Sequence, residues 1–482
     1  MRHADHLFTC LLVLCAVCAQ PGFSQCLPEG GPEFQSDIPS VPSQNTMTMR
    51  RDRLDRPYLY IASKEGGLRI FNISDLSAPQ SVKVIPTADL GGLQVMSLEQ
   101  YGRYLYLALG NHFPGVVQSP GMAIVDVDEP EAAIVTDFWA SPDFSSGGAG
   151  VVRAEGDYAY LGGMDNGLII LDVADKEHIA HVRNFKPDLD FPHGPPPPGD
   201  TAKFNARGME IRNDTLWLCY DRGGLRVIDV RDKSAPVEFS RYCNSILTGF
   251  ATAYNNIILR GNLAFLAIDY CGVEVLDVSD PLHIAQKGWW EPWTCPTNNP
   301  FVWGGSPGHA NELAYDEDCK LLFVATGKSD LHILSVSDPA QPDSCGFFGG
   351  VDNQIGTWGV DLWQNSLFLS YIFTVVPFQS NWTGVKVLTY PACTPDAVFN
   401  PGTAPDFQVY PNPADGTARL QFTTGDRVLR IALLDAAGRP FRSFDPDNGE
   451  LNLEGIPAGM YYLQVVMANG VGAKKLLITK GY

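Results

Sequence analysis

Long apolar stretches are scarce in this sequence of 482 residues. The clearest one lies at the start, over residues 7–19, behind a weakly basic leader. It is too short to cross a bilayer as a helix and is typical of a secretory signal peptide. We therefore expect residues 1–24 to be a signal peptide, cleaved after Ala19 or Ser24, and we expect no later segment to span a membrane.

Positive charge is also in short supply. Lys and Arg total 34 against 54 Asp and Glu, which gives a formal net charge of -20 and a pI near 4.8. This balance argues against nucleic acid or an anionic membrane as a partner, because both repel an acidic surface. It is instead typical of a solvated surface that keeps an exported protein soluble.

The motifs of common enzyme and metal sites are missing. The sequence has no GxSxG, HExxH, Walker A or GxGxxG motif in a fitting context. It has no CxxC pair, so a zinc site is not expected. The acidic run at residues 126–129 does not match the spacing of a calcium loop. We therefore predict no metal and no cofactor.

One motif is present in seven copies. In the fourth copy, Gly224 to Pro236, a short alternating strand is followed by a turn rich in Asp, Ser and Pro. A second strand precedes each copy, as Leu216-Trp217-Leu218 does here. The copies begin at Gly67, Gly121, Gly167, Gly224, Gly272, Asp330 and Gly384.

The spacing between these start positions, with no helical pattern between the copies, predicts a β-propeller over residues 26–391. Each copy supplies about four strands, which we name A to D from the axis outward, so seven copies predict seven blades. The seventh copy lacks a strand D, whereas Pro32 to Ser36 resembles the strand D that begins at Val237. We expect this N-terminal strand to close the ring and remove an open edge.

Eleven cysteines are present, and three of them leave with the signal peptide. The remaining eight allow about 105 pairings, which sequence alone does not resolve. Ring closure would place Cys26, at the start of the outer strand, near Cys393, at the end of the seventh strand C. We therefore predict a Cys26–Cys393 disulfide.

The C-terminal part differs from the repeats. Residues 392–405 are rich in Pro and read as a linker. Residues 406–482 alternate between apolar and polar positions, with turns at Asp415-Gly416 and Asn469-Gly470. This pattern predicts a small β-sandwich, so the expected fold is all-β, a seven-bladed propeller followed by a sandwich.

Two resemblances carry this interpretation further. The Gly-Leu-x-Ile-x-Asp-Val-x-Asp-x-x-x-Pro copies resemble the LVIVD-repeat family of bacterial extracellular propellers. The C-terminal domain resembles the type A C-terminal sorting domain of the type IX (Por) secretion system. The second likeness is carried in particular by Pro411, Asn412, Pro413, Gly459, Tyr461, Lys474 and Lys475.

The sorting domain implies a route and a partner. The chain would pass through the periplasm and interact with the type IX secretion machinery, and then be released or attached at the cell surface. The alternative is a generic β-sandwich that serves carbohydrate binding or adhesion.

Loop lengths indicate which face of the propeller is elaborated. The B–C and D–A connections emerge on one face, and the long insertions fall almost wholly there, at residues 111–120, 139–148, 185–205, 245–255, 291–309 and 373–383. Long loops on a rigid scaffold usually carry binding residues, although tolerated insertions would give the same pattern.

Candidate binding residues on this face form two groups. The first consists of aromatic and imidazole side chains that suit sugars or peptides: His112, His193, Trp293, Trp303, His309 and Trp358. The second consists of polar residues near the starts of inner strands, at the axial channel: Arg207, Glu210, Asn256, Asn311, Glu312 and Asp361. Packing between blades and ordinary channel solvation are the alternatives for the two groups.

These features favour a secreted or surface-attached, non-enzymatic protein that binds a glycan or a protein through its loop-rich face. The alternative is a propeller hydrolase or lyase that acts on extracellular polysaccharide with His and carboxylate groups of the same face. A third possibility is a surface scaffold without a ligand.

Overall fold

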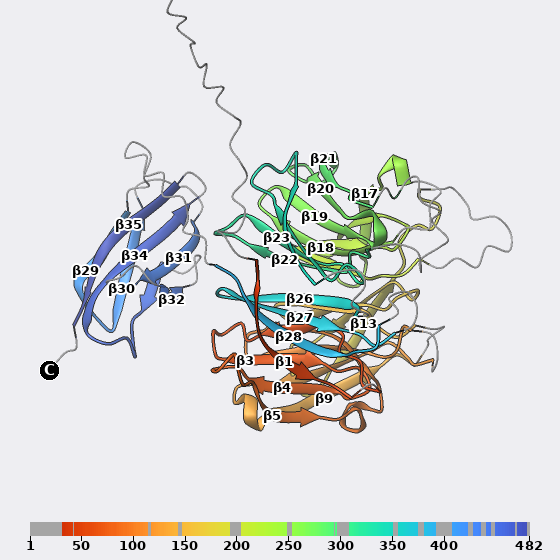
Figure 1. Cartoon of the computed structure of the whole chain (residues 1–482), viewed down its shortest axis with the longest axis horizontal. Coiled ribbons are helices and arrows are strands. Elements are labelled where there is room, and N and C mark those ends of the chain that lie inside the picture. Colours follow the sequence, from red (N-terminus) through yellow and green to blue (C-terminus); the bar gives the residue numbers. More distant parts are fainter. Residues whose placement is uncertain are drawn as a thin grey trace, which may run out of the picture. The chain divides into compact units, whose positions relative to one another are not determined.

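The computed structural model describes residues 31–41, 43–113, 117–142, 147–192, 204–247, 253–293, 295, 308–349, 355–374, 380–391, 407–422, 428–434, 440–444, 449–467 and 470–479 (Figure 1). The chain divides into two compact units, residues 1–393 and 394–482, which are considered separately. Within the described ranges, no helix has the length and apolarity needed to cross a membrane.

In the described part of the first unit, seven antiparallel sheets have four strands each. Strand A is β2 (Met49–Arg51), β6 (Val95–Tyr101), β10 (Val151–Glu155), β14 (Met209–Arg212), β18 (Tyr254–Arg260), β22 (Glu312–Asp316) or β26 (Thr357–Trp363). Strand B is β3 (Tyr58–Ala62), β7 (Tyr104–Leu109), β11 (Tyr158–Gly162), β15 (Thr215–Cys219), β19 (Leu263–Ile268), β23 (Leu321–Ala325) or β27 (Ser366–Tyr371).

The two outer strands complete each sheet. Strand C is β4 (Leu68–Asn72), β8 (Gly121–Asp126), β12 (Leu168–Asp172), β16 (Leu225–Asp229), β20 (Val273–Asp277), β24 (Leu331–Ser335) or β28 (Gly384–Thr389). Strand D is β5 (Gln80–Ile85), β9 (Ile134–Ala140), β13 (Ala180–Phe185), β17 (Val237–Tyr242), β21 (Ala285–Trp290), β25 (Asp343–Phe348) or β1 (Glu33–Pro39). Short 3-10 helices are η1 (Thr87–Leu90), η2 (Pro130–Ala132), η3 (Ser245–Leu247) and η4 (Asp269–Cys271).

The sheets form a closed ring. Each strand A contacts the strands A of both neighbouring sheets, in the order β2, β6, β10, β14, β18, β22, β26 and back to β2. The predicted all-β propeller is therefore confirmed, and the blades are numbered 1 to 7 in this order. Apolar side chains fill the space between blades; Leu59 and Ile61 of blade 1, for example, share a buried cluster with Phe368 and Val385 of blade 7.

The ring closes through the N-terminal strand. β1 runs antiparallel to β28, with Ile38 opposite Val385 and Pro39 opposite Gly384, so β1 is the outer strand of blade 7 (Figure 1). The Ser36 hydroxyl also donates to the carbonyl of Leu76 in blade 1, at 2.6 Å. Pairing of β1 leaves β28 without an open edge.

The repeat motif has a physical explanation in the turn from strand C to strand D. The side chain that ends strand C accepts the N–H two residues later, as Asp229 does from Arg231 at 2.9 Å. The next acidic residue of the motif does the same, as Asp232 does from Ser234 at 2.9 Å. These side-chain turns explain the Asp-Val-x-Asp spacing. Each C–D pair of blades 1 to 6 also contains a register shift at the middle of strand C.

The second unit is a small sandwich of two sheets. Its strands are β29 (Phe407–Asp415), β30 (Thr417–Phe422), β31 (Val428–Leu434), β32 (Pro440–Phe444), β33 (Glu450–Asn452), β34 (Gly459–Met467) and β35 (Gly470–Ile478). Their order is β32-β31-β34-β35-β29-β30-β33, and β29 links the two sheets. Buried Phe407, Leu433, Leu451 and Leu463 belong to the core.

Asn412 shows why the sequence Pro-Asn-Pro suits this place in β29. Pro411 and Pro413 carry no N–H, so the backbone of β29 cannot pair regularly there. The Asn412 side chain instead donates to the Lys475 carbonyl at 2.6 Å and accepts from the Leu477 N–H at 2.9 Å. Both residues lie on β35. Among the other motif residues, Tyr461 donates its hydroxyl to the Pro457 carbonyl at 3.0 Å.

Disulfides are present in the propeller. Cys271 is bonded to Cys295, and Cys319 is disulfide-bonded as well. Cys26 and Cys393 lie outside the described residues, so their pairing stays a prediction.

Candidate binding site in the axial channel

Charged side chains of the inner strands pair across the axial channel. Arg50 of blade 1 forms a salt bridge with Glu312 of blade 6, and Glu312 also accepts from the Thr48 hydroxyl at 2.9 Å and the Val360 N–H at 3.2 Å. Burial disfavours the Arg50 charge, but Glu312 and Asp361 outweigh burial and raise the pKa of Arg50. This pair is a fixed part of the channel wall.

A second ionic group joins three neighbouring blades. Arg153 of blade 3 lies 3.2 Å from Glu99 of blade 2 and 3.6 Å from Glu210 of blade 4. Burial raises the pKa of Glu210, and Arg153 opposes that shift. Glu210 therefore holds a proton more readily than a carboxyl group in water does.

A cavity of about 70 Å³ opens at the loop-rich end of the channel. At 10–15 Å³ per water it has room for about five waters, which is enough for one polar group of a larger ligand. The lining residues are Thr48, Arg50, Met96, Ser97, His112, Gly150, Val151, Arg153, Met164, Arg207, Asn255, Asn256, Asn311, Glu312 and Trp358.

Three β-bulges direct side chains into this cavity. The pairing of strands A and B shifts by one residue between Val95 and Ser97, between Tyr254 and Asn256, and between Thr357 and Gly359. The extra residues are Met96, Asn255 and Trp358, and all three line the cavity. Successive residues of a regular strand face opposite sides, so a bulge explains how Asn255 and Asn256 both reach it.

Some polar groups of the lining have no partner among the described residues. The Asn255 amide nitrogen donates to Asp269 at 2.7 Å and to the Ala310 carbonyl at 2.9 Å, whereas its oxygen Oδ1 is buried without a hydrogen bond. No hydrogen bond is formed within the described ranges by the Asn256 side chain or by the Nη groups of Arg207. The nearest approach of Arg207 to a carboxylate is 3.4 Å, from Nε to Asp221 Oδ1.

Aromatic rings lie beside these polar groups. His112 stacks on Phe113 with ring centroids 4.7 Å apart, and Phe113 lies 5.3 Å from Trp358. Burial, with help from the charges of Arg207 and Lys64, lowers the pKa of His112 to about 3. His112 is therefore neutral at physiological pH and suits an apolar or hydrogen-bonding contact rather than an ion pair.

In blades 4, 5 and 6 the third position of the motif contacts the loop that precedes the blade. In blade 4 this residue is Arg226, whose side chain is wholly buried. It donates to the carbonyl of Phe191, in the loop after β13, at 3.0 Å, and pairs with Glu238 of β17 at 2.9 Å. Its guanidinium also lies 5.1 Å from the Phe191 ring centroid.

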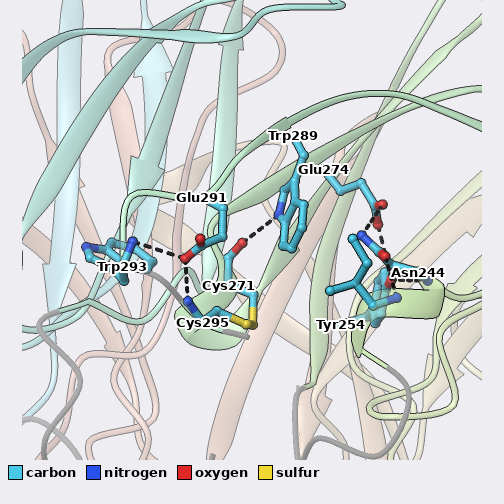
Figure 2. The surroundings of a disulfide bond; sticks show 9 residues. Asn244, Tyr254, Cys271, Glu274, Trp289, Glu291, Trp293 and Cys295 are labelled. Atoms are coloured by element: carbon cyan, nitrogen blue, oxygen red, sulfur yellow. Dashed lines mark hydrogen bonds between the residues drawn. A yellow bond between two sulfur atoms is a disulfide. The ribbon is translucent and has the colours of Figure 1, made fainter. Parts of the chain in front are cut away.

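The same position in blade 5 is Glu274, which is buried in a cluster of donors (Figure 2). It accepts hydrogen bonds from Tyr242 at 2.7 Å, from the Asn244 amide at 2.9 Å and from Tyr254 at 3.1 Å. Asn244 begins the loop between β17 and β18. Burial raises the pKa of Glu274 to about 7, although the three hydrogen bonds oppose the shift.

In blade 6 the position is His332, which packs on Trp290 and Trp293 with ring centroids 5.1 and 6.1 Å away. Burial lowers the pKa of His332 to about 4.

The loop that carries Trp293 is further tied by the Cys271–Cys295 disulfide. Glu291 in this loop accepts the Cys295 N–H at 2.7 Å, as Figure 2 shows. Each of these loops therefore starts from a fixed position beside its blade.

The twelve predicted binding residues are distributed as follows. Six of them, from five blades, line the cavity: His112, Arg207, Asn256, Asn311, Glu312 and Trp358. Glu210 pairs with the lining residue Arg153, and Asp361 accepts the Arg51 N–H at 2.7 Å. Trp293 packs on Trp290, and His309 lies 3.1 Å from Asp269, away from the cavity lining. His193 and Trp303 lie outside the described residues.

Sequence reasoning missed Arg50, Arg153 and the bulged residues Met96 and Asn255. A signal for Arg153 was available, because a charge in the middle of Val151-Val152-Arg153-Ala154 is unusual for an inner strand. The bulges left no comparable signal, since their extra residues are ordinary in composition.

Comparisons with known proteins agree with this architecture. The LVIVD repeat family matches residues 57–87, 146–186, 218–244, 253–290 and 307–347, which belong to blades 1, 3, 4, 5 and 6. Blades 2 and 7, which are unmatched, carry the long B–C loops. The family described as secretion system C-terminal sorting domain matches residues 408–479. A search of curated proteins finds no match.

The search of solved structures also finds β-propeller domains, at low sequence identity. The β-propeller domain of Myceliophteria thermophila Cps50 (Swd1) is 10% identical, with 75% of this chain and 100% of that chain covered and a TM-score of 0.49. The WD40 β-propeller domain of Doa1 is 8% identical, with 74% and 97% covered and a TM-score of 0.46. The chain therefore contains LVIVD repeats within a β-propeller, and its type IX C-terminal sorting domain directs its export to the cell surface or beyond.

Proposed function

We propose that the propeller is a non-enzymatic binding module that recognises an extracellular ligand, in first place a glycan, at the cavity on its loop-rich face. The observation that carries the proposal is the convergence of six polar and aromatic residues from five blades on one cavity. Aromatic rings beside amide and guanidinium donors suit a sugar, which has an apolar face and hydroxyl edges. A protein ligand could present similar apolar and hydrogen-bonding groups and is the second candidate.

The lining favours binding over turnover. A hydrolase of the common kind needs two carboxyl groups that flank the scissile bond. Among the described lining residues Glu312 is the one carboxylate, and it is held by Arg50, Thr48 and the Val360 N–H. The other function to consider, a polysaccharide hydrolase or lyase, draws support from Glu210, because its raised pKa suits a general acid.

A glycan array probed with the exported protein tests the proposal, and hydrolysis and lyase assays on the glycans that bind complete it. We expect binding without turnover, and we expect Trp358→Ala to weaken it at least tenfold because the rim loses its largest ring. Leu282→Ala, at a C–D turn on the opposite face, is the matched control. Turnover that Glu210→Gln abolishes would establish the enzyme instead.

A further inference from the structure

The charge of the cavity differs from that of the whole chain. The formal net charge of the protein is -20, whereas the lining contains three arginines, Arg50, Arg153 and Arg207, and one carboxylate, Glu312. Each of these guanidinium groups has a carboxylate partner, but the partners differ in how much of the group they occupy. Arg50 pairs with Glu312, and Arg153 pairs with Glu99 and Glu210.

Arg207 pairs with Asp221 through Nε alone, at 3.4 Å, and its position is fixed. Its N–H donates to the Cys219 carbonyl at 3.0 Å, and the neighbouring Ala206 bridges to Met164 of the preceding blade. The side chain is 23% exposed, and Nε is its atom nearest to Asp221. Within the described residues the two Nη groups therefore remain as donors for a ligand. A guanidinium that is partly removed from water binds an anion more strongly than an exposed one does.

Neighbouring groups complete an anion site. Asn256 carries an amide that makes no hydrogen bond to the described residues, and it lines the same cavity. Neutral His112 adds no competing charge, because its pKa is lowered to about 3. The bulge at Asn255 is an independent sign of a built site, since bulges re-aim side chains at functional positions.

We propose that this cavity receives the carboxylate of an acidic sugar, such as a uronic acid residue of an extracellular polysaccharide. The Nη groups of Arg207 hold the two carboxylate oxygens, and the Asn256 amide donates beside them. The apolar face of the sugar ring lies against Trp358, whose ring packs beside Phe113. This inference rests on the proposed function and specifies its ligand.

The test compares acidic polysaccharides with their own carboxyl-reduced forms. Alginate, pectate and hyaluronate are immobilised in both forms, and binding of the exported protein is measured at low salt and at 0.5 M NaCl. We expect binding to at least one acidic form, at least tenfold weaker binding to its reduced form, and weaker binding at high salt.

Variants place the effect at Arg207. Arg207→Met should lower binding of the acidic form to the level of the reduced form, and Arg207→Lys should give an intermediate value because it keeps the charge without the planar fork. Arg231→Met, on the exposed C–D turn of the same blade, should bind like the native protein. Equal melting temperatures check that the variants are folded.

The outcomes separate the two proposals. Equal binding of acidic and reduced forms, with sensitivity to Trp358→Ala, would overturn the carboxylate site and leave glycan binding intact. Binding to no polysaccharide, acidic or neutral, would overturn both the inference and the glycan function.

Discussion

Glu274 should make the stability of the propeller depend on pH. Its carboxyl is buried between blades 4 and 5, and burial raises its pKa from 4.5 to about 7. The folded state therefore holds this proton more tightly than the unfolded state does. The resulting stabilisation is fully present below pH 4.5 and is lost as the pH rises through 7.

The size of the effect follows from the shift. A difference of roughly 2.5 pH units, at 1.36 kcal/mol per unit, corresponds to about 3 kcal/mol. Glu274→Gln removes the ionisation and keeps a carbonyl oxygen for Tyr242 and Asn244. Its amide nitrogen faces the Tyr254 hydroxyl and can donate to it, as the O–H of the protonated carboxyl can. We expect this variant to match the native protein near pH 4.5 and to exceed its unfolding free energy by up to about 3 kcal/mol at pH 8.5.

Urea unfolding between pH 4.5 and 8.5, followed by tryptophan fluorescence, measures the effect. Glu317→Gln is the control, because Glu317 is a surface carboxylate with a side chain 55% exposed. Its profile should run parallel to that of the native protein. If the native and Glu274→Gln profiles also run parallel over this range, the argument from burial is refuted.

Two further predictions concern single contacts. Arg226→Met should lower the unfolding free energy by about 3 kcal/mol, because the carboxylate of Glu238 loses a buried ion-pair partner. It should also speed proteolysis of the loop after β13, whereas Arg231→Met should change neither property. Equal rates of cleavage in the two variants would contradict the role of Arg226 in holding this loop. Asn412→Ala should destabilise the sorting domain by about 1 kcal/mol and reduce the amount of exported protein; unchanged export and stability would argue against its bridging role.

The fold was predictable because each blade repeats the same physical solution. Asp229 and Asp232 end strand C in two side-chain turns, and this spacing recurs along the chain, so the motif reports the turn directly. The family and the route of export were predictable for a similar reason. In motifs such as Pro411-Asn412-Pro413, the residue types themselves form the local contacts: the Asn412 side chain bonds to the backbone of β35 where the two prolines cannot pair.

The site was predictable only in part. Residues that begin inner strands, such as Asn256 and Glu312, reach the channel because the propeller geometry brings every strand A to the axis. Trp293 and His309 instead pack against neighbouring blades, where no periodic pattern distinguishes a loop residue that faces solvent from one that faces the protein. Bulges escape prediction because one extra residue leaves composition unchanged.

The motif also helps to position loops on the loop-rich face, in addition to forming the blades. Arg226, Glu274 and His332 occupy the same motif position, and each contacts the loop before its blade. The recurring positions of the repeat therefore specify the strands and turns of each blade. In blades 4, 5 and 6 the variable third position also helps to position the preceding loop.

The most direct test of the account is to fill the cavity without disturbing the loops. Asn256→Trp places a large ring in the lining, and Leu282→Trp adds the same ring to an exposed turn on the opposite face. Binding of both variants to the polysaccharide panel is measured at matched thermal stability. The account predicts that Asn256→Trp abolishes binding and Leu282→Trp preserves it; equal binding by both would contradict the axial cavity as the ligand site.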